Sequence, residues 1–123
     1  MPSYELKVLG RFEAAHHLTA YRGSAEPVHG HSWRVEVTIR AVELGPEDYV
    51  VDFVEVKSAL DDLTGRFHHA DINSVSPFDA LSPTTENLAR WFCEELSLRF
   101  PAVEVAAVTV WEGPHCAATY LSE

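Results

Sequence analysis

An alternation of apolar and polar side chains over residues 4–16 constrains the fold of this chain most. Apolar residues stand at even positions from Tyr4 onward, and His16 continues the series. Because successive side chains of a strand point to opposite faces, this run predicts a half-buried strand with His16 on the side of Phe12. A second strand is predicted by the same alternation in Trp33, Val35, Val37 and Ile39.

Two helices are expected in the middle of the chain. Asp52 suits the N-cap of the first helix, and Gly65 suits its end. Between them, helical spacing is shown by Phe53, Val56, Leu60 and Leu63. The second helix would be capped by Thr84 or Ser82. Its apolar face is predicted to consist of Leu88, Trp91, Phe92 and Leu96.

Three further segments read as extended: a short piece at Tyr49–Asp52, a β-branched run at Val103–Glu112 and a last strand at Ala117–Leu121. We therefore expect residues 1–123 to form a single α+β domain of order ββααββ. Its sheet would be antiparallel and four-stranded, with both helices on one face. Four strands cannot close a barrel alone, so the open edges favour pairing between copies in a homo-oligomer.

Composition narrows the functional classes. The chain has 123 residues, 46% of them hydrophobic, which suits one core. No stretch approaches the roughly 18 apolar residues of a membrane span, and no signal peptide is evident, so we expect a cytoplasmic protein without a membrane partner. A net charge of −10 argues against nucleic-acid binding. Cys93 and Cys116 lie outside any CxxC pair, and we expect both to be free, buried thiols.

Clustered histidines are the strongest chemical signal. The chain has seven, and six of them form three pairs: His16-His17, His29-Gly30-His31 and His68-His69. Residues two apart in a strand project to one side, so His29 and His31 present two imidazoles together. A hairpin of the first two strands would add His16. Three imidazoles and one open position are what a catalytic zinc site requires, although a lone HxH can also be an accident of a His-rich loop.

Polar residues near the predicted strand and helix ends could contact a ligand. Glu112 ends a run in which two valines share its face. Its carboxylate would either turn to solvent or accept hydrogen bonds from a ligand with adjacent N–H donors. The N-terminus of the second helix offers ordinary capping groups or further ligand contacts in Thr84, Thr85 and Glu86.

Five short blocks are specific as an ordered set: Phe12-Glu13-Ala14-Ala15-His16, His29-Gly30-His31-Ser32, Val51-Asp52-Phe53 with Lys57, Pro83-Thr84-Thr85-Glu86-Asn87, and Trp111-Glu112. Together they resemble the 6-pyruvoyl-tetrahydropterin synthase and 6-carboxy-tetrahydropterin synthase family over nearly the whole chain. The resemblance implies the tunnelling fold, in which ββααββ subunits form barrels by oligomerisation, usually as a hexamer made of two trimers.

The resemblance also implies a cofactor and a substrate. The Zn²⁺ ligands would be His16, His29 and His31. Glu112 would anchor the ring of a small-molecule pterin, 7,8-dihydroneopterin triphosphate, whose side-chain hydroxyls the zinc would polarise.

Two positions depart from the family pattern. Ala25 stands where the synthases have a catalytic cysteine, and Glu26 instead gives the Glu-x-x-His-x-His arrangement of a subgroup that uses glutamate. That subgroup cleaves the side chain to 6-hydroxymethyl-7,8-dihydropterin. His68 stands where the family has an aspartate beside His69, which should weaken proton transfer through His69 unless Asp71 substitutes.

We therefore expect a zinc-dependent lyase that breaks a carbon–carbon or carbon–oxygen bond of the pterin side chain, with Glu26 as base and His69 as proton partner. One alternative is a 6-carboxy- or 6-pyruvoyl-tetrahydropterin synthase. The other is a pterin-binding zinc protein with impaired catalysis.

Overall fold

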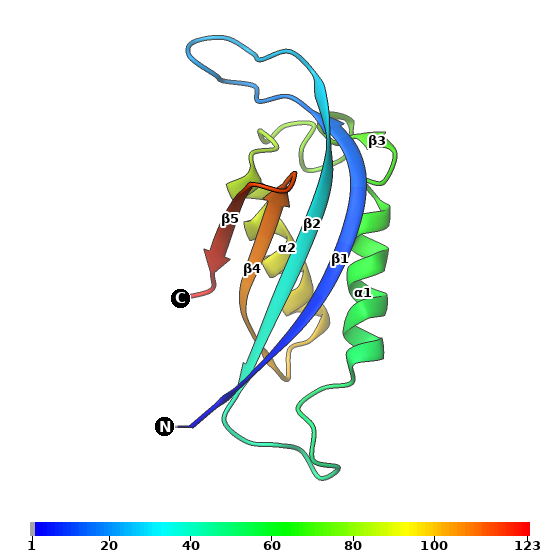
Figure 1. Cartoon of the computed structure of the whole chain (residues 1–123), viewed down its shortest axis with the longest axis vertical. Helices are drawn as coiled ribbons and strands as arrows, with labels where there is room; N and C mark the ends of the chain where they lie inside the picture. The colour runs from blue at the N-terminus through cyan, green and yellow to red at the C-terminus, as the bar shows by residue number, and fades with distance from the viewer. Residues whose placement is uncertain (1) are drawn as a thin grey trace.

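The computed structural model describes residues 2–123. Its elements in chain order are β1 (Tyr4–His16), β2 (His29–Ala41), α1 (Phe53–Gly65), β3 (Ala70–Asp71), the 3-10 turn η1 (Ile72–Ser74), α2 (Thr85–Arg99), β4 (Glu104–Glu112) and β5 (Cys116–Leu121). Figure 1 shows the strands in one curved layer with both helices on the same side of it. The predicted α+β class and the two-helix face are confirmed.

The sheet has one strand more than the sequence predicted. Its order is β3-β1-β2-β4-β5, and β1 pairs antiparallel with β2 along its whole length, from Tyr4 opposite Ala41 to His16 opposite His29. β3 runs parallel to β1 beside Ala14 and Ala15. The sheet is therefore mixed and five-stranded, and the prediction of four antiparallel strands was wrong on this point. A two-residue strand is too short for alternation to reveal it.

The extended piece predicted at Tyr49–Asp52 is not a strand. A turn precedes it, closed by a hydrogen bond from the Gly45 N–H to the Tyr49 carbonyl at 2.9 Å. Within that turn Asp48 has a φ of 65°, a left-handed conformation that aspartate tolerates better than most residues. The chain thus reverses here instead of adding a strand to the sheet.

Capping residues fix where the two helices begin. The Asp52 side chain accepts a hydrogen bond from the Val54 N–H at 2.9 Å, as the sequence predicted for α1. Thr84, rather than Ser82, caps α2 by accepting from the Asn87 N–H at 3.0 Å. α1 packs on β1, whereas α2 packs on β4 and β5.

The core supports the end of the sheet where the histidines lie. Phe12 and Trp33, both buried, stack with ring centroids 5.7 Å apart and planes 3° from parallel. The Trp33 indole N–H donates to the Ala14 carbonyl at 3.1 Å, which joins β1 to β2. His16, only 1% exposed, meets Trp33 edge-on at 4.7 Å between centroids. The side of the sheet predicted for His16 is therefore confirmed.

The cysteines differ in environment, although both are free. Cys93 is buried in α2, and burial raises the pKa of its thiol. Cys116 is exposed at the start of β5, so its predicted burial was wrong. The hairpin after Glu112 turns at Gly113 and leaves the first residue of β5 on the surface.

Within residues 2–123, no helix has the length and apolar character needed to cross a membrane.

Candidate metal centre

Three histidines from adjacent strands converge at one end of the sheet. His16 ends β1, while His29 and His31 begin β2, and the antiparallel register places His29 opposite His16. The Nε2 atoms of His16 and His29 are 3.1 Å apart. Together with Glu112, the three histidines offer ligand atoms that all lie within 4.8 Å of one another.

Backbone carbonyls orient two of these imidazoles. His16 Nδ1 lies 2.9 Å from the Pro83 carbonyl, and His29 Nδ1 lies 2.9 Å from the Pro27 carbonyl. A carbonyl can only accept, so each Nδ1 donates, and in the neutral form of each ring the lone pair is then at Nε2. In that form two lone pairs lie 3.1 Å apart and repel each other unless a cation lies near both. A carbonyl bound to the distal ring nitrogen is also the usual support of a metal-ligating histidine.

His31 completes the set of donors. Its Nε2 is buried and lies 2.6 Å from Glu112 Oε1. Burial, the largest cause, lowers the pKa of His31; Glu112 opposes this, and the imidazoles of His16 and His29 add to it. The neutral form that binds metals is thereby favoured, so the residues fit a metal ion such as zinc.

Glu112, expected from the sequence to face a ligand, lies against the histidines. Its Oε1 is 3.3 Å from His16 Nε2, and its Oε2 accepts a hydrogen bond from the Thr85 hydroxyl at 3.0 Å. Burial alone would raise the pKa of Glu112, but the Thr85 hydrogen bond and the nearby His16 and His31 together lower it. The two shifts therefore favour a charged carboxylate at Glu112 and a neutral imidazole at His31.

Glu26 lies beside the histidines, as its spacing suggested. One of its oxygens accepts a hydrogen bond from the Leu18 N–H at 2.9 Å and lies 3.8 Å from His29 Nε2. The Glu26 side chain is 16% exposed, so it is held within the loop that joins β1 to β2. A carboxylate fixed in this way can accept a proton from a molecule bound at the histidines.

Thr84, Thr85 and Glu86, the ligand contacts predicted at the N-terminus of α2, do not all contact the histidine–carboxylate group. Thr85 bonds Glu112, and Thr84 caps the helix. Glu86 lies in the first turn of α2 and is not part of the histidine–carboxylate group.

His69 is not brought into the group. Its imidazole is exposed and stacks on His68 with centroids 3.8 Å apart. Its backbone N–H donates to the Glu13 carbonyl at 2.6 Å, while His68 Nδ1 accepts from the Glu13 N–H at 3.1 Å. The Asp71 side chain caps η1 by accepting from the Asn73 N–H at 3.1 Å, so it is engaged there rather than with His69.

Comparison with known proteins identifies the family. A family model described as 6-pyruvoyl tetrahydropterin synthase matches residues 5–123, almost the whole chain. The chain belongs to the 6-pyruvoyl tetrahydropterin synthase family. The family resemblance inferred from the five sequence blocks is therefore confirmed.

Relatives within this family have different activities. The dihydroneopterin monophosphate aldolase of Pyrococcus furiosus is 31% identical over 104 residues, covering 83% of both chains. The 6-carboxy-5,6,7,8-tetrahydropterin synthase of Aquifex aeolicus is also 31% identical and covers 98% of this chain and 99% of its own. The structure of the 6-pyruvoyl tetrahydropterin synthase of Caenorhabditis elegans superimposes with a TM-score of 0.84 at 24% identity, covering 100% of this chain and 98% of the other. This likeness supports the tunnelling fold.

Proposed function

We propose that this protein is a zinc-dependent lyase that cleaves the side chain of a phosphorylated 7,8-dihydroneopterin to give 6-hydroxymethyl-7,8-dihydropterin. The observation that carries the proposal is the position of Glu26, a fixed carboxylate 3.8 Å from His29, in a chain that has Ala25 where the synthases have cysteine. The aldolase among the relatives supports the same reaction class.

Zinc would be held by the Nε2 atoms of His16, His29 and His31, and when bound it would lower the pKa of a substrate hydroxyl. The protein's own groups supply the remaining chemistry. Glu26 takes the proton of the hydroxyl on the second side-chain carbon, which is the outer carbon of the carbon–carbon bond to be broken.

The cleavage then balances as a retro-aldol reaction. The deprotonated hydroxyl becomes the carbonyl of an aldehyde that leaves with the phosphate. The electron pair of the broken carbon–carbon bond passes into the C=N bond of the dihydropterin ring. A proton is then added to the ring-side carbon, and we assign that transfer to His69 on residue type alone, since its imidazole lies outside the histidine–carboxylate group of a single chain. One base and one acid suffice, which suits a site whose cysteine and aspartate are replaced.

Product mass tests this assignment. Metal-loaded protein is incubated with mono- and triphosphorylated 7,8-dihydroneopterin, and the products are identified by mass spectrometry. 6-Hydroxymethyl-7,8-dihydropterin is the expected product. Formation of 6-carboxy-tetrahydropterin would instead favour the activity for which the Aquifex relative is named. Formation of 6-pyruvoyl-tetrahydropterin would favour the activity for which the family is named. Binding without conversion would mean that catalysis is impaired.

Glu112 is proposed to anchor the pterin ring, with Thr84, Thr85 and Glu86 as neighbouring contacts. Its carboxylate can accept two hydrogen bonds from the adjacent N–H donors of the ring. An oxygen that ligates a metal cannot do this at the same time, so the closeness of Glu112 to the histidines makes the role testable.

For Glu112→Gln we expect near-normal zinc content and a KM raised by about tenfold or more, because an amide presents one acceptor where the carboxylate presents two. Zinc analysis and steady-state kinetics measure both. Glu104→Gln, an exposed change at the other end of β4, is the control. A large loss of zinc in Glu112→Gln alone would show that Glu112 is a metal ligand instead.

We further propose that the protein is a homohexamer. Among residues 2–123, β5 has a strand neighbour on one side only, and β3 covers only Ala14 and Ala15 of β1. Free edges favour pairing with another copy. Size-exclusion chromatography with light scattering is expected to give about six times the 13.7 kDa mass of the chain. A particle of one chain would contradict the proposal.

A further inference from the structure

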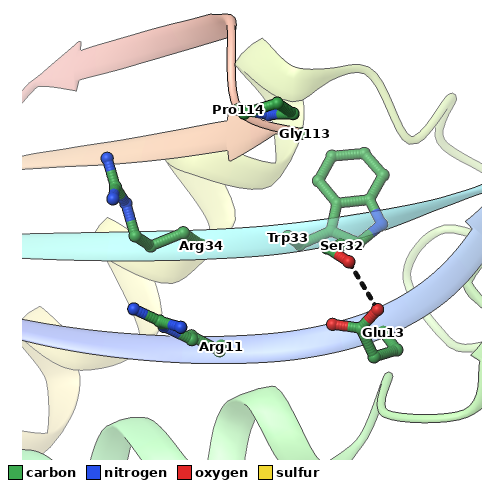
Figure 2. A pocket seen from close by; sticks show the side chains of 7 residues that line it. All are labelled: Arg11, Glu13, Ser32, Trp33, Arg34, Gly113 and Pro114. Carbon is green, nitrogen blue, oxygen red and sulfur yellow. Dashed lines mark hydrogen bonds between the residues drawn. The ribbon is translucent and has the colours of Figure 1, made fainter.

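The face of the sheet that carries no helix has a hollow of about 350 Å³, and this hollow is distinct from the histidine site. It is lined by Arg11, Glu13, Ser32, Arg34, Gly113 and Pro114, together with Trp33. Figure 2 shows these residues on the neighbouring strands β1 and β2 and on the turn between β4 and β5. In β1, Arg11 and Glu13 alternate with buried Phe12 and Ala14. The hollow and His16 therefore lie on opposite faces of the sheet.

Two arginines in this hollow lie next to each other. Arg11 on β1 is directly opposite Arg34 on β2. Within residues 2–123 neither guanidinium has a carboxylate oxygen inside 4.0 Å. Like charges directly opposite each other destabilise a sheet, and this chain has only 9 basic residues against 19 acidic ones. An unneutralised pair in so acidic a chain calls for an anionic partner from outside it.

Arg34 is held in place and still has a donor unused. Its guanidinium carbon lies 4.8 Å from the centroid of the Trp111 ring, a cation–π contact that fixes the side chain without neutralising it. Its Nε is buried and has no hydrogen-bond partner among residues 2–123. A buried donor without a partner costs free energy that a bound acceptor would recover.

Glu13 does not neutralise the arginines. Its carboxylate accepts a hydrogen bond from the Ser32 hydroxyl at 2.6 Å, which Figure 2 shows as a dashed line. The turn at Gly113, which lines the hollow next to Ser32, is also held in place, because the Gly113 N–H donates to the Ser32 carbonyl at 3.0 Å. Gly113 has a φ of 73°, a conformation that glycine adopts without strain.

We propose that this hollow binds the phosphate group of a small molecule. Arg11 and Arg34 would donate to the phosphate oxygens in the forked geometry that suits guanidinium groups. Glu13, at the other end, would accept a hydrogen bond from a hydroxyl or amine of the same ligand. The volume is at the lower end of the range for small-molecule sites. The proposal does not rest on the proposed function.

The test uses inorganic phosphate as probe. Phosphate is titrated calorimetrically into metal-loaded protein at constant ionic strength, with chloride as the reference salt. Arg11→Gln and Arg34→Gln are each expected to weaken binding by about tenfold or more, since each removes charge-assisted hydrogen bonds. Arg34→Lys should be intermediate. Arg40→Gln, an exposed change on the same strand, controls for charge alone and should bind as the wild type does.

Thermal melting checks that each variant is folded. If the wild type binds no phosphate, or if both glutamine variants bind it with wild-type affinity, the proposal is overturned; the second result would place the phosphate at the metal. His31→Ala should lose metal but keep phosphate binding, so failure of the proposed function is distinguishable from failure of this site. If Arg34→Gln raises only the KM for phosphorylated dihydroneopterin, the substrate is the source of the phosphate. If that KM is unchanged, the hollow binds a separate phosphate ligand.

Discussion

Replacing His31 by alanine is expected to abolish both the proposed zinc binding and the proposed lyase activity. His31 supplies a buried Nε2 that lies 2.6 Å from Glu112 Oε1, and burial lowers its pKa toward the neutral, ligating form. Without it, two imidazoles remain, one fewer than a catalytic zinc site uses. Zinc content should fall from near-stoichiometric to near none, and turnover should fall to background. Metal analysis and product mass spectrometry measure the two losses.

His31 is a better target than His16 because it is less essential to folding. The His31 side chain is 27% exposed, whereas that of His16 is 1% exposed and packs on Trp33. The matched control is His115→Ala, which removes an exposed imidazole outside the cluster and should keep both zinc and turnover. Stoichiometric zinc in a folded His31→Ala protein would exclude the three-histidine centre.

The sequence could predict the histidine convergence because two long strands define it. Alternation in β1 and β2 sets which side chains face the helices, and an antiparallel hairpin then leaves few possible registers. His16 at the end of one strand and His29 at the start of the next are therefore opposite each other. Helix caps at Asp52 and Thr84 were predictable for a similar reason, since capping is a local interaction.

Features that depend on contacts between distant segments were not predictable. β3 exists because the turn after α1 brings Ala70 alongside Ala14, and two residues carry no alternation. The carbonyl that orients the His16 imidazole comes from Pro83, 67 residues further along the chain. No side-chain pattern marks a carbonyl acceptor. The Thr85–Glu112 hydrogen bond likewise joins α2 to β4 and has no local signal beyond two polar residues near element ends.

Glu26→Gln should lower kcat by about 10²–10⁴-fold while leaving zinc content unchanged. Glutamine keeps the size of the side chain and one oxygen that can still accept the Leu18 N–H, so the loop should retain its conformation. What it loses is the ability to take a proton. Steady-state kinetics with phosphorylated 7,8-dihydroneopterin, together with zinc analysis, measure the effect, and Glu43→Gln in an exposed turn is the control.

The direction in which kcat and KM change decides what Glu26 does. If Glu26 is the base, kcat falls and KM changes little, because the proton is transferred only in the chemical step. If Glu26 only shapes the loop between β1 and β2, KM should rise and the melting temperature should fall, since the contact with Leu18 would then be its main contribution. A kcat that is unchanged in a variant with full zinc would remove Glu26 from the mechanism, and the reaction would then need a base from elsewhere in the site.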